Sequence, residues 1–188
     1  MVAAVRGARV LTVVAGLLAA AAAAIVPRMT AEELAAQSAW IVHGAVVRSW
    51  VGWDSEHKYI WTHYAVAVAE MVRGPHVATI TVSEPGGSLD GVNMSTSGTL
   101  PFAMGEETVL FLYQTPIGFW RTVGGPQGKF TVTVEGRVRT EAHGIAFAEP
   151  AGGARTGTPL AALEGIPTGD FLARVRRLAV AYPYRGGQ

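Results

Sequence analysis

The pattern of hydrophobic and polar positions in the first half of the chain predicts three successive β-strands. Residues 39–51 and 59–73 form two long runs rich in Val, Ala and Trp, and a polar loop separates them. A third run, residues 77–83, lies between Gly74-Pro75 and Pro85-Gly86-Gly87. β-Branched and aromatic residues favour strands, whereas Gly and Pro interrupt them. We therefore expect a three-stranded meander.

Four more strands are predicted farther along the chain. Residues 107–113 are almost continuously apolar, which is typical of a central strand that is covered on both faces. Residues 119–123 form a short strand, and residues 130–134 and 137–140 form a hairpin around Glu135-Gly136. Residues 85–98 show no periodicity and are rich in Gly, Ser and Asn, so we expect a long loop there.

Short helices are predicted on either side of the strands. Thr30 and Glu33 match a capping box, which predicts a helix over residues 31–37. Thr158-Pro159 begins a second short helix that Gly165 ends. A third begins at Thr168 and ends before Pro183, and its apolar residues recur at helical spacing: Phe171, Leu172, Val175, Leu178 and Ala179. This C-terminal helix is therefore expected to be amphipathic.

Residues 1–24 have the pattern of an export signal. Arg6 and Arg9 precede an uncharged run from residue 10 to residue 24, which ends in small residues suited to a signal peptidase. The alternative is an uncleaved helix that anchors the chain, and it would be the chain's one contact with the membrane. We expect cleavage after Ala24 and a periplasmic or extracellular location. Because there is no cysteine, the chain can form neither a lipoprotein anchor nor a disulfide.

Removal of the signal changes the charge balance. The segment contains two of the 15 Lys and Arg residues and none of the 14 Asp and Glu residues, so 13 basic residues would face 14 acidic ones. Proteins that bind nucleic acid concentrate positive charge. A nucleic-acid partner is therefore not expected.

The predicted fold is all-β with short flanking helices, an N-terminal signal helix and a C-terminal amphipathic helix. Residues 59–73 would span roughly 45–50 Å at about 3.3 Å per residue, which is too long for a flat sheet in a chain of this size. A strand that bends around a barrel resolves this, so we expect an OB-like barrel, closed or partly open, over residues 25–142. Residues 143–188 would form a Gly-rich linker and a helical extension.

Candidate catalytic and metal-binding residues are few. None of the five histidines has the spacing of a helical zinc motif. His43 and His63 are on the first two predicted strands and are candidates for cross-strand neighbours, but a metal site needs three or four ligands. Glu106 and Glu107 are adjacent on a strand and would point to opposite faces. We expect no catalytic residues, no metal and no cofactor.

Other reactive-residue motifs are also missing from the sequence. Ser88, Ser95 and Ser97 lack the G-x-S-x-G context of a hydrolase nucleophile. The glycine pairs Gly86-Gly87 and Gly124-Gly125 do not match a phosphate-binding loop, so we interpret them as turns.

Aromatic residues gather around the first predicted hairpin. Four of the five tryptophans lie between residues 40 and 61. Exposed aromatic faces bind partner proteins or sugars. We take Trp50, Trp53, Tyr59 and Trp61 as candidate binding residues. The alternative is that they pack on one another and on a flanking helix.

Several segments resemble a known fold family. They are residues 38–46, 66–74, 80–82 and 105–112, together with Pro85-Gly86-Gly87 and Gln127-Gly128-Lys129-Phe130. The pattern resembles the netrin-like OB-fold domain of the tissue inhibitors of metalloproteinases, and exported bacterial proteins of that type more closely still. The resemblance implies a five-stranded barrel used for binding. Those inhibitors place a cysteine on the protease zinc, and this chain has none, so their mechanism does not carry over.

The sequence thus favours an exported, non-enzymatic module that binds another protein. The resemblance suggests a secreted protease, or the substrate of one, as the partner. Two alternatives stay open: a carbohydrate- or envelope-binding module that uses the hairpin aromatics, and a hydrolase with an unrecognised site.

Overall fold

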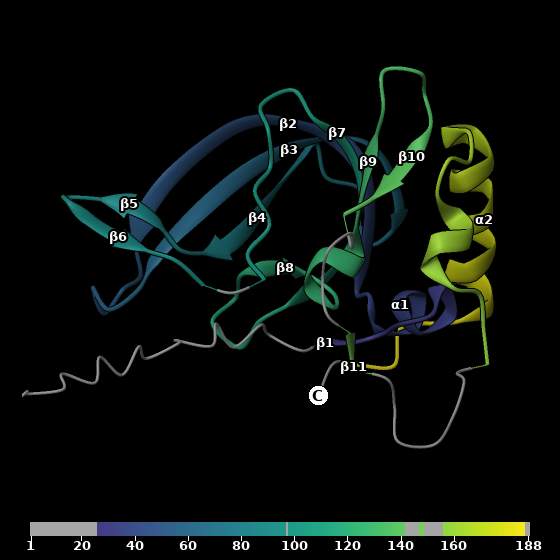
Figure 1. Cartoon of the computed structure of the whole chain (residues 1–188), viewed down its shortest axis with the longest axis horizontal. Helices are drawn as coiled ribbons and strands as arrows, with labels where there is room; N and C mark the ends of the chain where they lie inside the picture. The colour runs from purple at the N-terminus through teal and green to yellow at the C-terminus, as the bar shows by residue number, and fades with distance from the viewer. Residues whose placement is uncertain (1–25, 97, 142–146, 149–155, 187–188) are drawn as a thin grey trace, which may run out of the picture.

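The computed structural model describes residues 26–96, 98–141, 147–148 and 156–186 (Figure 1). The predicted signal helix and most of the predicted linker lie outside these residues. Within the described part of the chain, strands predominate and helices flank them, as predicted. Neither of the α-helices described there has the length and apolarity needed to cross a membrane.

The predicted meander is present. Strands β2 (Trp40–Trp53), β3 (Ile60–Arg73) and β4 (Thr79–Pro85) pair antiparallel in chain order. The β2–β3 register shifts at three points, the last of them between Val46 and Arg48. Such bulges bend a strand and increase its twist. They allow the two long strands to curve around the molecule, as Figure 1 shows.

Five strands form a ring. Strand β7 (Glu107–Gln114) pairs with β2, and β8 (Trp120–Thr122) pairs with β7. The ring then closes through β4 and β8, which are parallel and meet at one residue pair, Val82 and Trp120. The order β7-β2-β3-β4-β8 makes an OB-like barrel that is partly open between β4 and β8. The predicted fold class is therefore confirmed.

Strand β7 is the central strand, as predicted. Its residues 109–112 are at most 1% exposed, so both faces of the strand are covered. The predicted hairpin is also present: β9 (Lys129–Val132) pairs with β7, and β10 (Val138–Thr140) pairs with β9. A short 3-10 helix, η1 (Gly125–Gly128), precedes it. A small separate pair consists of β1 (Val26–Pro27) and β11 (Phe147–Ala148).

Two apolar clusters lie on opposite faces of this sheet. Leu110 and Leu112 face the inside of the barrel, and Leu100 and Phe102 from the preceding loop fill it. Phe111 and its neighbours on the outer face pack beneath the helices. There the rings of Phe111, Phe130 and Phe171 form a chain, with centroids 5.7 and 4.8 Å apart.

The helices begin and pack as their sequences predict. Helix α1 (Ala31–Gln37) has the predicted capping box, in which Thr30 Oγ1 accepts from the Glu33 amide at 3.2 Å. The apolar stripe of α2 (Thr168–Ala181) faces the sheet, with Phe171, Leu172 and Val175 buried. The predicted short helix after Pro159 is a 3-10 turn, η2 (Leu160–Leu163).

One arginine joins both α-helices to the barrel. Arg73, at the end of β3, donates from Nη1 to the carbonyls of Ala35 and Ser38, the latter at 2.8 Å. Its Nη2 donates to the carbonyls of Ala179 and Tyr182 at 2.5 and 2.7 Å. Carbonyls at a helix C-terminus have no partner within the helix and carry partial negative charge. A single guanidinium therefore satisfies the ends of α1 and α2 together.

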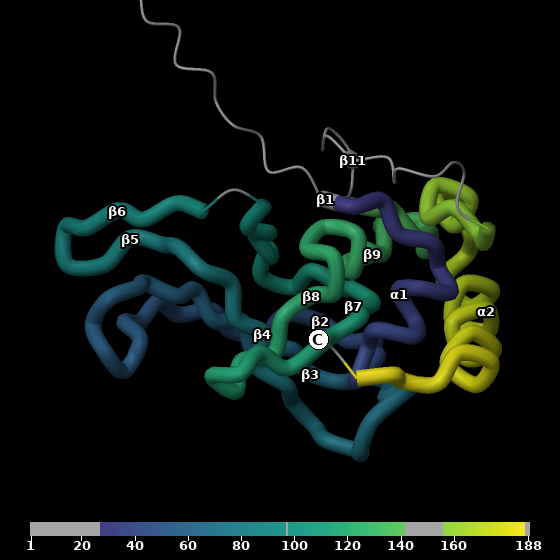
Figure 2. The backbone as a smooth tube through the Cα atoms, turned by 90° about the horizontal axis from the view of Figure 1, so that it is seen from below, coloured from purple at the N-terminus to yellow at the C-terminus, as the bar shows by residue number. Residues whose placement is uncertain are grey.

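The sequence predicts a long loop over residues 85–98, and the prediction misses two short strands. A hairpin of β5 (Gly87–Leu89) and β6 (Val92–Met94) lies within it. Asp90 and Gly91 both have positive φ, 53° and 77°, which is the geometry of a tight two-residue hairpin turn. Figures 1 and 2 show this hairpin beside the tip of β2–β3, at the end of the molecule away from α2.

Candidate binding groove

A groove with aromatic walls lies along the open side of the barrel, between β4 and the turn that joins β7 to β8. It has a volume of about 430 Å³. We call it the aromatic groove. No Asp, Glu, Lys or Arg lines the groove. The residues that line it are Trp40, Trp50, His63, Val77, Thr79, Ile80, Thr81, Ser83, Gly118, Phe119 and Trp120.

Stacked rings form the groove walls. Trp40 and Trp120 stack with their centroids 4.1 Å apart. His63 stacks on Trp50 at 5.3 Å, and Phe119 meets the His63 ring edge-on at 5.4 Å. Gly74 lies behind Trp40, where a Cβ would come within 2.9 Å of Trp40 Cδ1 and where φ is +119°. The rings are thus fixed by their neighbours before any ligand arrives.

The four aromatic residues proposed from the sequence do not form one surface. Trp50 is 37% exposed and lines the groove. Trp61 is only 9% exposed and packs edge-on against Phe119, with centroids 4.9 Å apart. Trp53 donates to Asp90 Oδ2 at 3.1 Å and so connects the β2–β3 tip to the β5–β6 hairpin. Tyr59 is 52% exposed at that tip.

Sequence reasoning missed Trp40, Phe119 and Trp120 as groove residues. Trp40 begins β2, and the other two follow Gly118 in a turn that is far away in the chain. Two adjacent aromatic residues after a turn glycine were the available signal. Their approach to Trp40 depends on the closure of the ring, which no local pattern encodes.

His63 and Ser83 form a pair at the groove wall. His63 Nδ1 and Ser83 Oγ are 2.7 Å apart across β3 and β4. Burial lowers the pKa of His63, which favours the neutral ring. The Ser83 side chain is enclosed at 1% exposure, whereas a nucleophile must reach its substrate. This pair therefore orients the His63 ring.

His43 and His63, which the sequence left as candidates for cross-strand neighbours, are not neighbours. His43 is opposite Glu70, and His63 is opposite Trp50, because the register places them far apart along the hairpin. His43 Nε2 instead contacts Glu107 Oε1 at 2.7 Å. In the described part of the chain, no three His, Asp or Glu side chains converge as metal ligands would.

Charged groups are buried close to the groove. Glu84 is 1% exposed, and its Oε2 lies 3.2 Å from Arg121 Nη2. Burial raises the pKa of Glu84, although Arg121 opposes the shift. In a second pair, Lys129 Nζ is 2.7 Å from Glu106 Oε1 and lies over the ring of Phe102. These charges are directed at each other and do not line the aromatic groove.

Strand β4 offers an open edge beside the groove. It pairs with β3 along its whole length, from Thr79 to Pro85. On its other side, the pairing described is with β8 at Val82 alone. An edge of this kind presents backbone donors and acceptors to an additional strand. The main-chain edge and the aromatic walls thus lie side by side.

The chain matches no protein-family model, no curated protein and no solved structure at a significant level. The netrin-like resemblance therefore stays a prediction from the sequence.

Proposed function

We propose that this chain is an exported, non-enzymatic module that binds an extended, uncharged segment of a partner protein in the aromatic groove. One observation carries the proposal. The groove has aromatic walls, has no charged lining residue, and adjoins the open edge of β4.

A partner segment that pairs with β4 as an added strand would use both the open edge of β4 and the aromatic walls of the groove. Main-chain hydrogen bonds to a sheet edge give affinity, and pockets for alternate side chains give specificity. A segment paired with Thr79–Thr81 would lie along this wall of the groove and direct every second side chain into it. Burial of each aliphatic side chain contributes about 1.5–3 kcal/mol. Tryptophan is also enriched among residues that dominate binding energy.

The two alternative functions fit the groove less well. Aromatic faces suit sugar rings, but buried sugar hydroxyls also need several free polar side chains. Apart from the indole groups and the hydroxyls of Thr79 and Thr81, the polar side chains that line the groove are His63 and Ser83, whose Nδ1 and Oγ atoms already contact each other. A hydrolase would need an accessible nucleophile, and Ser83 is enclosed.

The proposed partner lies outside the cytoplasm, a location that the export signal expected in residues 1–24 supports. A secreted protease or its substrate remains the partner class that the netrin-like resemblance suggests.

The experiment is selection of peptides from a displayed library with the mature protein, followed by affinity measurement. We expect selected peptides with apolar residues at alternate positions. Trp50→Ala and Phe119→Ala should weaken binding at least tenfold in protein that circular dichroism shows to be folded at the temperature of the assay. Tyr59→Ala is the matched control, since Tyr59 is exposed but lies outside the groove.

Backbone N-methylation of the peptide tests the strand-pairing geometry. Methyl groups on alternate amides should abolish binding in one register and spare it in the other. If both methylated forms bind like the parent peptide, pairing with β4 is excluded. If neutral oligosaccharides displace the peptide, the carbohydrate alternative gains support.

A further inference from the structure

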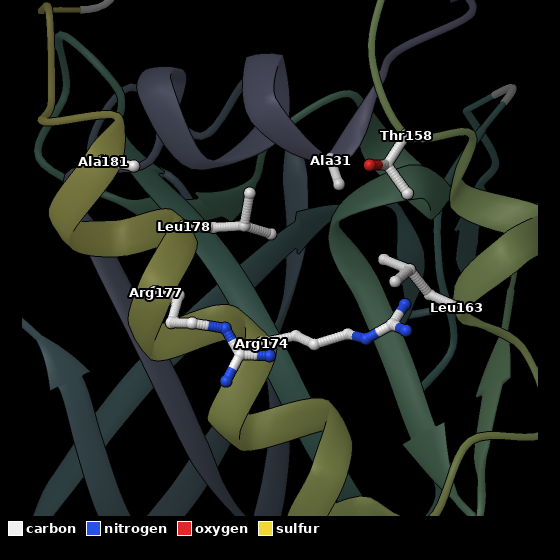
Figure 3. A pocket seen from close by; sticks show the side chains of 7 residues that line it. All are labelled: Ala31, Thr158, Leu163, Arg174, Arg177, Leu178 and Ala181. Atoms are coloured by element: carbon white, nitrogen blue, oxygen red, sulfur yellow. The ribbon is translucent and has the colours of Figure 1, made fainter.

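A second pocket lies between the two α-helices and η2, away from the aromatic groove. Its volume is about 250 Å³ (Figure 3). Apolar side chains from three segments form its walls: Ala31 of α1, Leu163 of η2, and Leu178 and Ala181 of α2. The pocket could therefore accept an apolar group.

Two arginines stand at the entrance of this pocket. Arg174 and Arg177 are one helical turn apart on α2, and residues three apart share a helix face. Figure 3 shows both guanidinium groups at the open side, with that of Arg174 extending toward Leu163. Both side chains are exposed.

These guanidinium groups are not neutralised by the described residues. Neither forms an ion pair within that part of the chain. By contrast, Arg176 on the same helix bonds both oxygens of Glu70 at 2.7 Å. The positive charge at the pocket entrance is thus available to a ligand.

The other polar groups of the pocket are already engaged. Thr158 donates from its amide and its hydroxyl to the two oxygens of Glu32, both at 2.8 Å. Desolvation raises the pKa of Glu32, but the hydrogen bonds from Thr158 outweigh it and hold the pKa below its usual value. Glu32 is therefore an anion whose two oxygens are held by Thr158, and the two arginines are the donors left among the residues that line the pocket.

We propose that this pocket binds a monocarboxylate with an apolar tail. Guanidinium groups hold carboxylates through paired, charge-assisted hydrogen bonds. An apolar cavity of about 150 Å³ accepts benzene, so this one would accommodate a tail of about six to eight carbons. The free end of a fatty acid and the C-terminus of a peptide share this chemistry. The inference does not depend on the function proposed for the aromatic groove.

Titration of the protein that lacks residues 1–24 with octanoate, followed by calorimetry and by methyl NMR, tests the site. We expect saturable binding that shifts the methyl signals of Ala31 and Leu163 but not the indole signal of Trp50. Octanol, which has a similar tail without charge, and octylammonium, which has the opposite charge, should bind at least tenfold more weakly. N-Acetyl-leucine compares a peptide C-terminus with the fatty-acid chain, and the tighter of the two carboxylates identifies the source.

The variant R174Q/R177Q should lower the affinity for octanoate at least tenfold. R176Q removes one positive charge from the same helix, outside the pocket, and it should alter the affinity less than twofold. Undiminished binding by R174Q/R177Q, octanol binding as tight as octanoate binding, or no saturable octanoate binding by the folded protein would each overturn the proposal.

Discussion

Replacing Arg73 with alanine should destabilise the protein by about 2–5 kcal/mol. The guanidinium serves four backbone carbonyls at the ends of α1 and α2, and alanine removes all of these donors at once. Both helices would lose their attachment to β3 at the same point.

The expected magnitude follows from the burial of the acceptors. Ala35 and Ser38 are fully buried, so water cannot easily replace the guanidinium; the Ala35 carbonyl would keep only the long bond from the Ser38 amide, at 3.3 Å. Each unsatisfied buried acceptor costs about 1–3 kcal/mol. Ala179 and Tyr182 are only partly buried, and water can hydrate their carbonyls. The first two acceptors therefore account for most of the loss.

Urea unfolding followed by circular dichroism measures this effect. Arg176→Ala is the control, since Arg176 is an exposed residue of α2 that forms an ion pair with Glu70, and its loss should matter much less. Arg73→Lys should fall between the wild type and Arg73→Ala, because one ammonium cannot reach four carbonyls. A loss below about 1 kcal/mol for Arg73→Ala would show that the carbonyls find other partners, which refutes the reasoning.

Three further changes test the barrel. Leu110→Ala should cost about 2–5 kcal/mol in a denaturant melt, and a loss below about 1 kcal/mol would contradict its burial inside the ring. Gly44→Ala should prevent normal β2–β3 pairing, since a Cβ there would lie 2.2 Å from the Ala67 carbonyl oxygen; an unchanged melting temperature would contradict this. Burial raises the pKa of Glu84, so the folded protein retains a proton that the unfolded chain releases, and stability should fall as pH rises from about 4.3 through the raised value. In thermal melts at a series of pH values, Glu84→Gln should reduce this dependence of stability on pH. If the dependence is unchanged, other titratable groups cause it.

The strands and helix starts could be predicted because their signals are local. The capping box at Thr30 and the apolar run of β7 each depend on neighbouring residues alone. The β5–β6 hairpin was missed although Asp90-Gly91 is a strong turn signal. Its two strands are only three residues long, which is too short for an alternation of polar and apolar residues to be recognised.

The candidate site was only partly predictable because it depends on ring closure. Trp50 belongs to a local group of aromatic residues that the sequence displays. Phe119 and Trp120 reach the same groove from a turn more than 60 residues away, after β8 has joined β4. Arg73 is a similar case, since its four acceptors come from two helices at opposite ends of the described chain.

The packing of Phe171 against Phe130 has a consequence for a chain that is cut between the barrel and α2. The rings lie 4.8 Å apart, and both side chains are fully buried. A cut between residues 141 and 156 should therefore leave two complementary fragments that hold together without a covalent link. Each fragment alone would expose a face that only the other covers, so the fragments should reassociate when mixed in equal amounts. The barrel and the C-terminal helix would then fold as one cooperative unit.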